Sequence, residues 1–421
     1  MGRSTNWAGN VTFNAQRLFR PTSVEQLQHL VAGSPRIRAV GTGHSFNRIA
    51  DTSEDLVSLD GLASGIELAG RGSTVTVGAG TRYAELAQWL YAEGLALPNL
   101  GSLPHISVGG ACATGTHGSG NGNGNLATVV SAVEMVTADG EVVVLDRDTD
   151  AAVFGGAVVG LGSLGIVTRL TLDTIRSFDV AQYVYDDMPQ EQLTTDLSTI
   201  LSSAYSVSVF TDWRLPRIRQ VWLKRRIDSG GPWPAEPRWL GATLADGPRH
   251  PVAGMSAGVC TEQQGVVGPW HERLPHFRHA FPPRGGSELQ SEYHVSRTDA
   301  ADALAALRPI RDDIARVLHI SEIRSCAADD LWMSPNYRRD TVSIHFTWVN
   351  DADAVSRVLR MIEPRLQPYG ARPHWGKLFC MEPEVVRAQY ERSSDFEKLL
   401  ADYDPNGKFR NAFIDAHFPR Q

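Results

Sequence analysis

The hydrophobic pattern of the first 175 residues switches between helical and strand periods. Apolar residues recur at helical spacing over residues 24–31 and 83–90, which predicts two helices. The pair Asp139-Gly140 interrupts an alternating run at 133–145 and strongly favours a hairpin. Further strands are predicted at residues 37–40, 56–59, 74–77 and 166–172. We expect one α+β unit over residues 1–175.

Beyond residue 175 glycine becomes rarer, and the pattern predicts a second unit over residues 176–370. Strands are expected at residues 206–210, 221–223, 291–295, 321–325 and 342–349, helices at 299–317 and 351–362, and irregular segments at 229–238 and 281–286. Several strands with two helices favour a sheet that is covered on one face. A helix over 383–400 and a turn at 404–413 follow in a C-terminal segment, 371–421, which the pattern alone assigns to neither unit.

Composition excludes several classes of protein. Hydrophobic residues make up 42% of the 421 and charged residues 21%, as in ordinary folded proteins. A net charge of −7 without a basic run argues against a nucleic-acid partner. The four cysteines lie far apart and form no C-x-x-C pair, so we expect reduced thiols, no disulfides and no bound metal. No apolar window is long enough to span a bilayer, and we expect a cytoplasmic monomer without a membrane partner.

Two glycine-rich segments are candidates for binding a diphosphate through backbone N–H groups. The first, G-T-G-H-S-F-N at 41–47, directly follows a predicted strand. The second has seven glycines between Gly109 and Gly124. A P-loop ending and a Rossmann G-x-G-x-x-G between strand and helix are both missing, so a different nucleotide scaffold is required.

Polar residues at strand spacing mark a second candidate site. Glu322 and Arg324 are two apart, as are Ser343, His345 and Thr347, so each set shares one face of its strand. Burying such groups is costly unless a polar partner lies beside them, and a hydroxyl-rich substrate fits. The segment R-P-H-W-G-K at 372–377 adds an imidazole and an ammonium group.

These motifs, in this order, closely resemble those of the alditol (xylitol) oxidases of the vanillyl-alcohol oxidase flavoprotein superfamily. The resemblance runs from Asn6 to Phe413 and includes G-T-G-H-S-F-N, P-N-L-G-S-L-P-H-I-S-V-G-G-A-C-A-T-G-T-H-G-S-G, E-I-R, H-F-T-W and H-W-G-K. It implies an α+β fold with an FAD-binding domain of the PCMH type at 1–175, a substrate domain with a mixed or antiparallel sheet covered by helices at 176–370, and a segment at 371–421 that completes the FAD domain and the active site.

The resemblance also implies the site residues. FAD would be linked covalently through its 8α-methyl group to His44, and by that bond alone, since the segment 103–107 has no cysteine; Cys112 reads as a small buried residue. The FAD would further contact Ala39, Val40, Gly41, Thr42, Gly43, Ser45, Ser102, Ser107, Gly110, Ala113, Thr114, Gly115, His117, Gly118, Ile166, Val167 and His374, with Ile166 and Val167 on its adenine side. Substrate hydroxyls would be held by Ser102, Glu322, Arg324, Thr347 and Lys377.

The expected reaction is oxidation of a terminal primary alcohol of a polyol such as xylitol, sorbitol or glycerol to the aldehyde, with O2 reduced to H2O2. His345 and Lys377 are both candidates for the base, with His345 favoured because its ordinary pKa suits the role. The alternative role of Lys377 is to stabilise the developing alkoxide, and Arg324 is the third catalytic candidate. Gly101 would leave room for dioxygen. The alternatives are a sugar-1,4-lactone oxidase or dehydrogenase of the same superfamily and a nucleotide-binding sensor. Chain length of the preferred polyol stays open.

Overall fold

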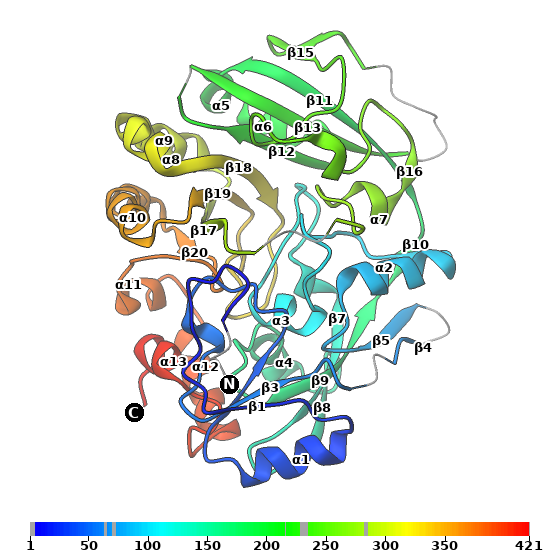
Figure 1. The fold of residues 1–421 in the computed structure, drawn as a ribbon, viewed down its shortest axis with the longest axis vertical. Helices are drawn as coiled ribbons and strands as arrows, with labels where there is room; N and C mark the ends of the chain where they lie inside the picture. Colours follow the sequence, from blue (N-terminus) through cyan, green and yellow to red (C-terminus); the bar gives the residue numbers. More distant parts are fainter. Residues whose placement is uncertain are drawn as a thin grey trace.

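The first unit is built on two sheets, one parallel and one antiparallel. The computed structural model describes residues 5–62, 65–69, 73–214, 216–227, 235–281 and 285–420 (Figure 1). A three-stranded parallel sheet has the order β1 (Arg17–Phe19), β3 (Asp55–Ser58), β2 (Ile37–Val40). A five-stranded antiparallel sheet has the order β4 (Glu67–Ala69), β5 (Thr74–Gly78), β9 (Ile166–Asp173), β7 (Val130–Val136), β8 (Val142–Asp146). The predicted hairpin is therefore confirmed as β7 and β8.

Short helices and a small ribbon complete this unit. They are α1 (Val24–Gly33), α2 (Tyr83–Ala92), α3 (Val108–Ala113) and α4 (Ala151–Val158), with β6 (Leu95–Ala96) pairing with β10 (Ile175–Arg176). Helix α1 begins after Ser23, whose hydroxyl accepts the Gln26 N–H at 3.3 Å. Every second residue of β9 is buried, so its alternating pattern marks one face packed on the core.

The second unit is a ten-stranded sheet in which every pairing among the described residues is antiparallel. Its order is β14 (Arg238–Trp239), β15 (Ala242–Leu244), β11 (Asp179–Pro189), β13 (Arg217–Ile227), β12 (Ser206–Thr211), β18 (Leu318–Cys326), β19 (Thr341–Val349), β17 (Glu288–Ser296), β20 (Arg372–Pro373), with β16 (Gly268–Pro269) beside β11. The helices are α5 (Gln192–Thr195), α6 (Leu197–Leu201), α7 (Trp270–Arg273), α8 (Ala300–Leu307), α9 (Arg311–Val317) and α10 (Ala352–Leu366).

The two faces of this sheet have opposite characters. Ile344, Phe346 and Trp348 of β19 are fully buried in one apolar cluster together with residues of α8, α9 and α10, and Figure 1 shows these three helices along one side of the sheet. The alternate positions of β19 carry His345 and Thr347, which therefore point to the opposite face. The expected sheet with one helical face is confirmed, and its other face is free for chemistry.

The C-terminal segment returns to the first unit. It contains α11 (Pro383–Arg387), α12 (Ser393–Tyr403) and α13 (Ala412–His417), and its Trp375 and Phe396 belong to the apolar core of the first unit. The Ile37 N–H of β2 donates to the Lys408 carbonyl at 2.9 Å. The Asn411 amide donates to three carbonyls of the segment 48–51. Residues 408–411 thus brace the chain on both sides of the first glycine loop.

Two predicted helices are broken in the structure. The segment 299–317 is divided into α8 and α9 by a 3-10 turn at Arg308–Ile310, where Pro309 has no N–H for the helical ladder. The segment 383–400 is interrupted between α11 and α12. In this gap the Arg372 guanidinium donates a hydrogen bond to the Gln389 carbonyl at 2.9 Å, and the Tyr390 ring stacks on Trp375. Strand β11 lies where no strand was predicted. Of the irregular segments predicted from the sequence, residues 229–234 and 282–284 lie outside the described residues.

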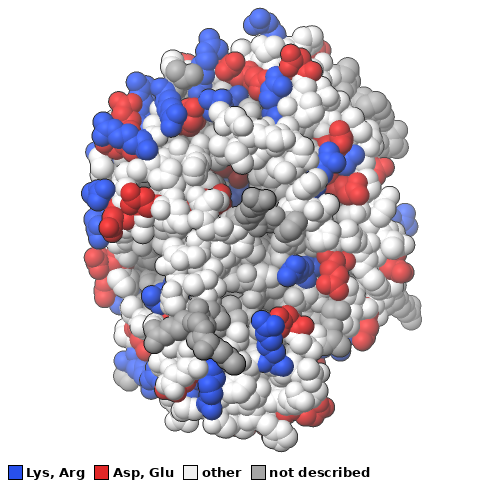
Figure 2. All heavy atoms as spheres, in the orientation of Figure 1, with Lys and Arg blue, Asp and Glu red and all other residues white. Residues whose placement is uncertain are grey.

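Surface charge and thiols agree with the composition. Lys and Arg side chains are interspersed with Asp and Glu over the face shown in Figure 2. All four cysteines are free, and Cys112 is buried, as predicted. Within the described ranges, we find no helix with the length and apolar character that a membrane crossing requires.

Candidate active site

A cavity of about 1010 Å³ lies between the first unit and the polar face of the large sheet. It is large enough for a dinucleotide and a small substrate together, since pockets for drug-sized ligands are typically about 300–1,000 Å³. Of the residues predicted from the sequence, the following line it: Ala39, Val40, Gly41, Thr42, Gly43, His44, Ser45, Gly101, Ser102, Ser107, Gly110, Ala113, Thr114, His117, Glu322, Arg324, His345, Thr347, His374 and Lys377. The four separated motifs therefore meet in one space.

Four residues predicted to contact a cofactor are not among those that line the cavity: Gly115, Gly118, Ile166 and Val167. Ile166 is fully buried in β9, where it pairs with Val136. Gly118 packs so closely that a Cβ there would lie 2.2 Å from the Asn99 side-chain oxygen. Their contact with a cofactor stays a prediction.

The first glycine loop presents His44 to the cavity as a neutral imidazole. The His44 ring stacks on Trp7 with 5.1 Å between centroids, and Nδ1 lies 2.9 Å from the Thr42 hydroxyl. Its Nε2 is buried and has no hydrogen-bond partner among the described residues. Burial, helped by His105, lowers the pKa of His44 to about 4, so a ring lone pair is available at neutral pH.

The two glycine segments are packed against each other at Ser107. A Cβ on Gly41 would lie 2.3 Å from the Ser107 hydroxyl oxygen, so the close approach requires glycine. A Cβ on Gly110 would lie 3.0 Å from the same oxygen. The two segments are therefore in close contact at this point, and both glycines line the cavity.

The segment 372–377 is bonded directly to the first glycine loop. The Phe46 N–H donates to the Gly376 carbonyl at 2.7 Å, and the Asn47 amide donates to the Trp375 and Lys377 carbonyls at 2.8 Å each. Lys377 and His44 are thus carried by neighbouring, mutually bonded loops.

On the large sheet, Glu322 and Arg324 lie beside His345 as their spacing predicted. Glu322 pairs with His345 across β18 and β19. Burial opposes ionisation of Glu322, but Arg324 and His276 outweigh it and hold the pKa of that carboxyl well below its ordinary value. Arg324 donates from one Nη to the Ser102 hydroxyl at 3.3 Å, which joins the sheet to the loop of the first unit.

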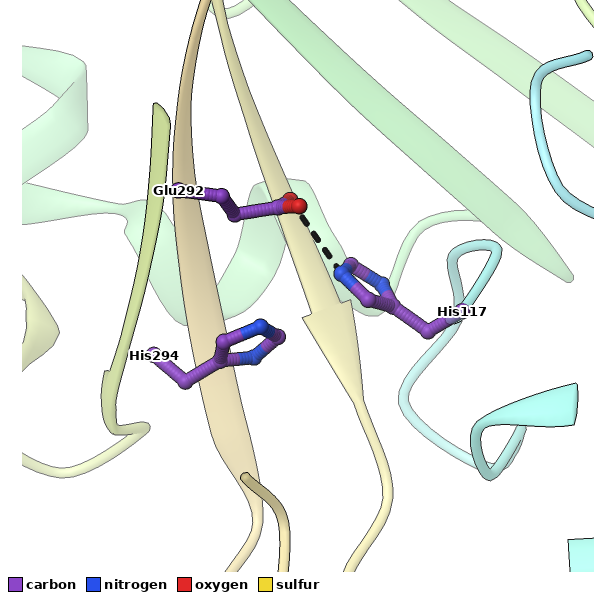
Figure 3. A group of neighbouring side chains, drawn as sticks. All are labelled: His117, Glu292 and His294. Carbon is purple, nitrogen blue, oxygen red and sulfur yellow. Dashed lines mark hydrogen bonds and ion pairs between the residues drawn. The ribbon is translucent and has the colours of Figure 1, made fainter. Parts of the chain in front are cut away.

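Glu292 of β17, which sequence reasoning missed, is the central acceptor of the site. One oxygen accepts from His117 Nε2 at 3.1 Å (Figure 3). The same oxygen accepts from Arg324 at 2.8 Å, and the other oxygen accepts from Lys377 Nζ at 2.7 Å. Burial raises the pKa of Glu292, but these partners, Lys377 first, overcome it and keep the pKa well below its ordinary value. The signal was present in S-E-Y-H-V, where a carboxylate interrupts an otherwise strand-like run.

The group His117, Glu292 and His294 has ligand atoms within 4.8 Å of one another, a spacing that a metal ion could use (Figure 3). However, Arg324 and Lys377 already occupy both oxygens of Glu292 as cations. A further cation would meet two positive charges there, so the electrostatics favour the ion-paired arrangement.

The candidate bases differ in how they are held. Burial, with a contribution from Lys377, lowers the pKa of His345 well below its ordinary value, and burial lowers the pKa of His374 to about 3, so both rings are neutral. His345 Nε2 lies 3.1 Å from the Gln290 side-chain oxygen, while its Nδ1 is buried without a partner among the described residues. Burial also lowers the pKa of Lys377, although Glu292 opposes this.

A second pair that sequence reasoning missed lies behind Glu322. His276 lines the cavity, and its Nε2 is 2.7 Å from a Glu322 oxygen. Lys224 of β13 lies 3.1 Å from His276 Nδ1. A lysine directly after the apolar run 221–223 is the only sequence signal for this pair, since the loop L-P-H-F at 274–277 has no distinguishing pattern.

Comparisons with known proteins agree with these features. Residues 15–146 match the model of an FAD-binding domain, and residues 283–417 match that of D-arabinono-1,4-lactone oxidase. The chain is 50% identical over 416 residues to the alditol oxidase of Streptomyces sp. (strain IKD472 / FERM P-14339), with 97% of each chain covered. It is 26% identical to the L-gulonolactone oxidase of Bos taurus, with 98% of this chain and 97% of that one covered.

The solved structure of cholesterol oxidase from B. sterolicum is similar in fold, with a TM-score of 0.79, 15% sequence identity and coverage of 99% of this chain and 96% of that one. The expected α+β fold, an FAD-binding domain joined to a sheet with helices on one face, is thereby confirmed.

Proposed function

Because this chain belongs to the alditol oxidase family of FAD-dependent oxidoreductases, we propose that it oxidises the terminal primary alcohol of an acyclic polyol to the aldehyde, with O2 reduced to H2O2. The observation that carries this proposal is the row of polar side chains, Glu322, Arg324 and Thr347, that faces the cavity from the large sheet opposite His44. Covering these polar groups with an apolar substrate would cost free energy because they would lose hydrogen-bond partners, whereas several substrate hydroxyl groups could bond to them.

The residues present fit an FAD held by the two glycine segments. Gly41 and Gly110 line the cavity and have no side chains, so a diphosphate could approach the backbone of both segments closely. His44, neutral and with an unpartnered ring nitrogen, would form the single covalent bond to the flavin. When bound, the flavin supplies the hydride acceptor and passes the electrons on to O2.

Substrate hydroxyls would be bound by donors and acceptors of both units. Arg324 donates and the ionised Glu322 accepts, so together they suit the distal hydroxyls of an extended polyol. Ser102, already bonded to Arg324, and Thr347 would hold the hydroxyls nearer the reacting carbon. A simple alkyl alcohol leaves these groups unsatisfied and should be a poor substrate.

For the chemical step we assign the base to His345 and the alkoxide-stabilising charge to Lys377. Lys377 is paired with Glu292 at 2.7 Å and so is held as an ammonium that donates. His345, which lines the cavity as a neutral ring, would accept the hydroxyl proton as the C–H bond gives up its hydride. The proton thus passes from substrate oxygen to the imidazole, and the electrons leave with the hydride.

The alternative substrate class is a sugar-1,4-lactone, which the match of residues 283–417 to D-arabinono-1,4-lactone oxidase favours. A peroxide assay with xylitol, sorbitol, glycerol, 1-pentanol and L-gulono-1,4-lactone separates the two. Turnover of the polyols above the lactone supports the proposal; turnover of the lactone alone overturns it.

The covalent flavin is tested by acid precipitation of the purified protein. We expect the yellow absorbance to remain in the pellet of the wild type and to be released from His44→Ala, while the surface control His29→Ala behaves like the wild type. Free FAD in the wild-type supernatant would remove the His44 linkage from the proposal.

A further inference from the structure

Lys224 holds its ammonium group in the protein interior. The residue is 1% exposed, and Nζ lies 2.9, 2.6 and 2.9 Å from the carbonyl oxygens of Arg273, Leu274 and Pro275, which share its three N–H hydrogens with His276 Nδ1. Burial lowers the pKa of Lys224 to about 7. The surrounding carbonyl oxygens can only accept hydrogen bonds, so they favour the protonated form, which has three hydrogens and no lone pair. The loop after α7 is therefore gathered around one buried cation.

The same ammonium sets the tautomer of His276. Nζ lies 3.1 Å from Nδ1, and because an ammonium only donates, Nδ1 must be the acceptor. Burial and the charge of Lys224 lower the pKa of His276 to about 4, so the ring is neutral and its one proton is on Nε2. That N–H donates to the Glu322 carboxylate at 2.7 Å.

Two aromatic rings and a backbone hydrogen bond also hold His276. Phe210 and Trp222 meet it edge to face, with centroids at 5.6 and 5.2 Å. The His276 backbone N–H donates to the Ser102 carbonyl at 3.2 Å. One loop residue therefore contacts both Ser102 and Glu322, the two groups to which we assigned substrate hydroxyls.

The hydrogen bond from His276 Nε2 competes with Arg324 Nε for the same Glu322 oxygen. Arg324 Nε is buried without a hydrogen-bond partner and lies 3.6 Å from the Glu322 oxygen, longer than a hydrogen bond. Without His276, the carboxylate would be free to close this gap and satisfy Nε. A direct hydrogen bond between Glu322 and Arg324 would turn the carboxylate and the guanidinium toward each other and away from the cavity.

We propose that Lys224 and His276 are positioning residues for Glu322, which keep its carboxylate directed at the distal hydroxyls of a polyol and so set the preference for polyols over alcohols without distal hydroxyls. This role rests on the function proposed above. Neither residue takes part in proton or hydride transfer.

The first test compares His276→Leu with His276→Gln, whose side-chain amide offers an N–H near the position of Nε2. We expect His276→Leu to lower the ratio of kcat/KM for xylitol to that for 1-pentanol about 10- to 100-fold, mainly through KM, as loss of a hydrogen bond to a charged group does. His276→Gln should recover most of the ratio. His271→Leu, on α7 and outside the cavity lining, is the matched control and should keep the wild-type ratio.

A ratio that His276→Leu leaves unchanged, in a variant with wild-type flavin content, overturns the proposal. A wild type that oxidises no polyol instead overturns the proposed function, and the two failures are therefore distinct. An equal fall for both alcohols in His276→Leu with no rescue by His276→Gln indicates general disruption and also counts against positioning.

The second test does not depend on turnover. In 15N-histidine NMR of the wild type, with His276 assigned by comparison with His276→Gln, we expect a neutral ring protonated on Nε2. Lys224→Met should move the ring toward a mixture of tautomers. A wild-type ring protonated on Nδ1 would contradict the inference.

Discussion

Replacing Glu292 by Gln is the most informative single change in the site. The substitution keeps the shape of the side chain but removes the negative charge of the carboxylate, which accepts hydrogen bonds from Arg324, Lys377 and His117. The new NH2 group must also face a donor, whichever way the amide is turned. Removing one partner of a buried ion pair typically costs about 3–5 kcal/mol, so we expect a measurable loss of stability along with the catalytic effect.

The catalytic effect follows from Lys377. Burial already lowers the pKa of Lys377, and Glu292 is the first group that opposes this, so in Glu292→Gln the pKa must fall further. The ammonium that stabilises the alkoxide is then lost at a lower pH. We expect kcat/KM for xylitol to fall about 10²- to 10³-fold near neutral pH, the usual cost of one charge-stabilising donor, and to recover partly toward acid pH.

The assay is the pH profile of kcat/KM, with flavin content and a urea titration measured on the same preparation. Glu363→Gln is the matched control, because Glu363 is also a buried acceptor, bonded to Tyr293 at 2.7 Å, but does not line the cavity. It should lose stability and keep the wild-type profile. An alkaline limb that does not move in Glu292→Gln, with kcat/KM within about threefold of wild type, would refute the reasoning.

Three further outcomes are expected. Gly101→Ala places a methyl group in ordinary contact, with its nearest atoms at 3.9 Å, and should slow flavin reoxidation by O2 in stopped-flow experiments at unchanged flavin content; an unchanged rate excludes this route for dioxygen. Thr347→Val should raise KM for xylitol about tenfold, since a substrate hydroxyl loses its partner, and the KM for 1-pentanol serves as the internal comparison. The folded-state pKa values of His276 and His374, about 4 and about 3, lie below the ordinary value of a histidine. Their contribution to stability is therefore complete above about pH 6.5 and is lost as the pH falls toward 4. The urea midpoint should decline over this pH range, and a flat profile would contradict the buried neutral rings.

Local patterns predicted the parts of the fold that have strong periodicity. The hairpin at Asp139-Gly140 and the shared face of Glu322 and Arg324 followed from spacing alone, because side-chain direction alternates in a strand regardless of its partners. The helix predicted over 383–400 is divided into α11 and α12, and Tyr390 between them stacks on Trp375, a contact that the pattern of residues 383–400 does not contain.

The difference between local patterns and long-range contacts also explains which site residues the sequence predicted. Residues in motifs were found, whereas Glu292 and Lys224 lie in strands without a recognisable motif. Their side-chain partners His117, Arg324, Lys377 and His276 are 32 to 175 residues away along the chain. A buried charge in a strand signals that a partner exists but not which one. Only the assembled sheet brings His117, Arg324 and Lys377 to the same carboxylate.

The bracing of the first glycine loop by residues 408–411 has a consequence for how the protein is made. Ile37 bonds to Lys408, and Asn411 bonds to the carbonyls just beyond His44, so the loop gains its final supports from the last tenth of the chain. These supports lie about 360 to 371 positions further along the chain than the residues that they hold. The loop that carries His44 therefore reaches its mature geometry only after residues 408–411 have been synthesised and have docked on it.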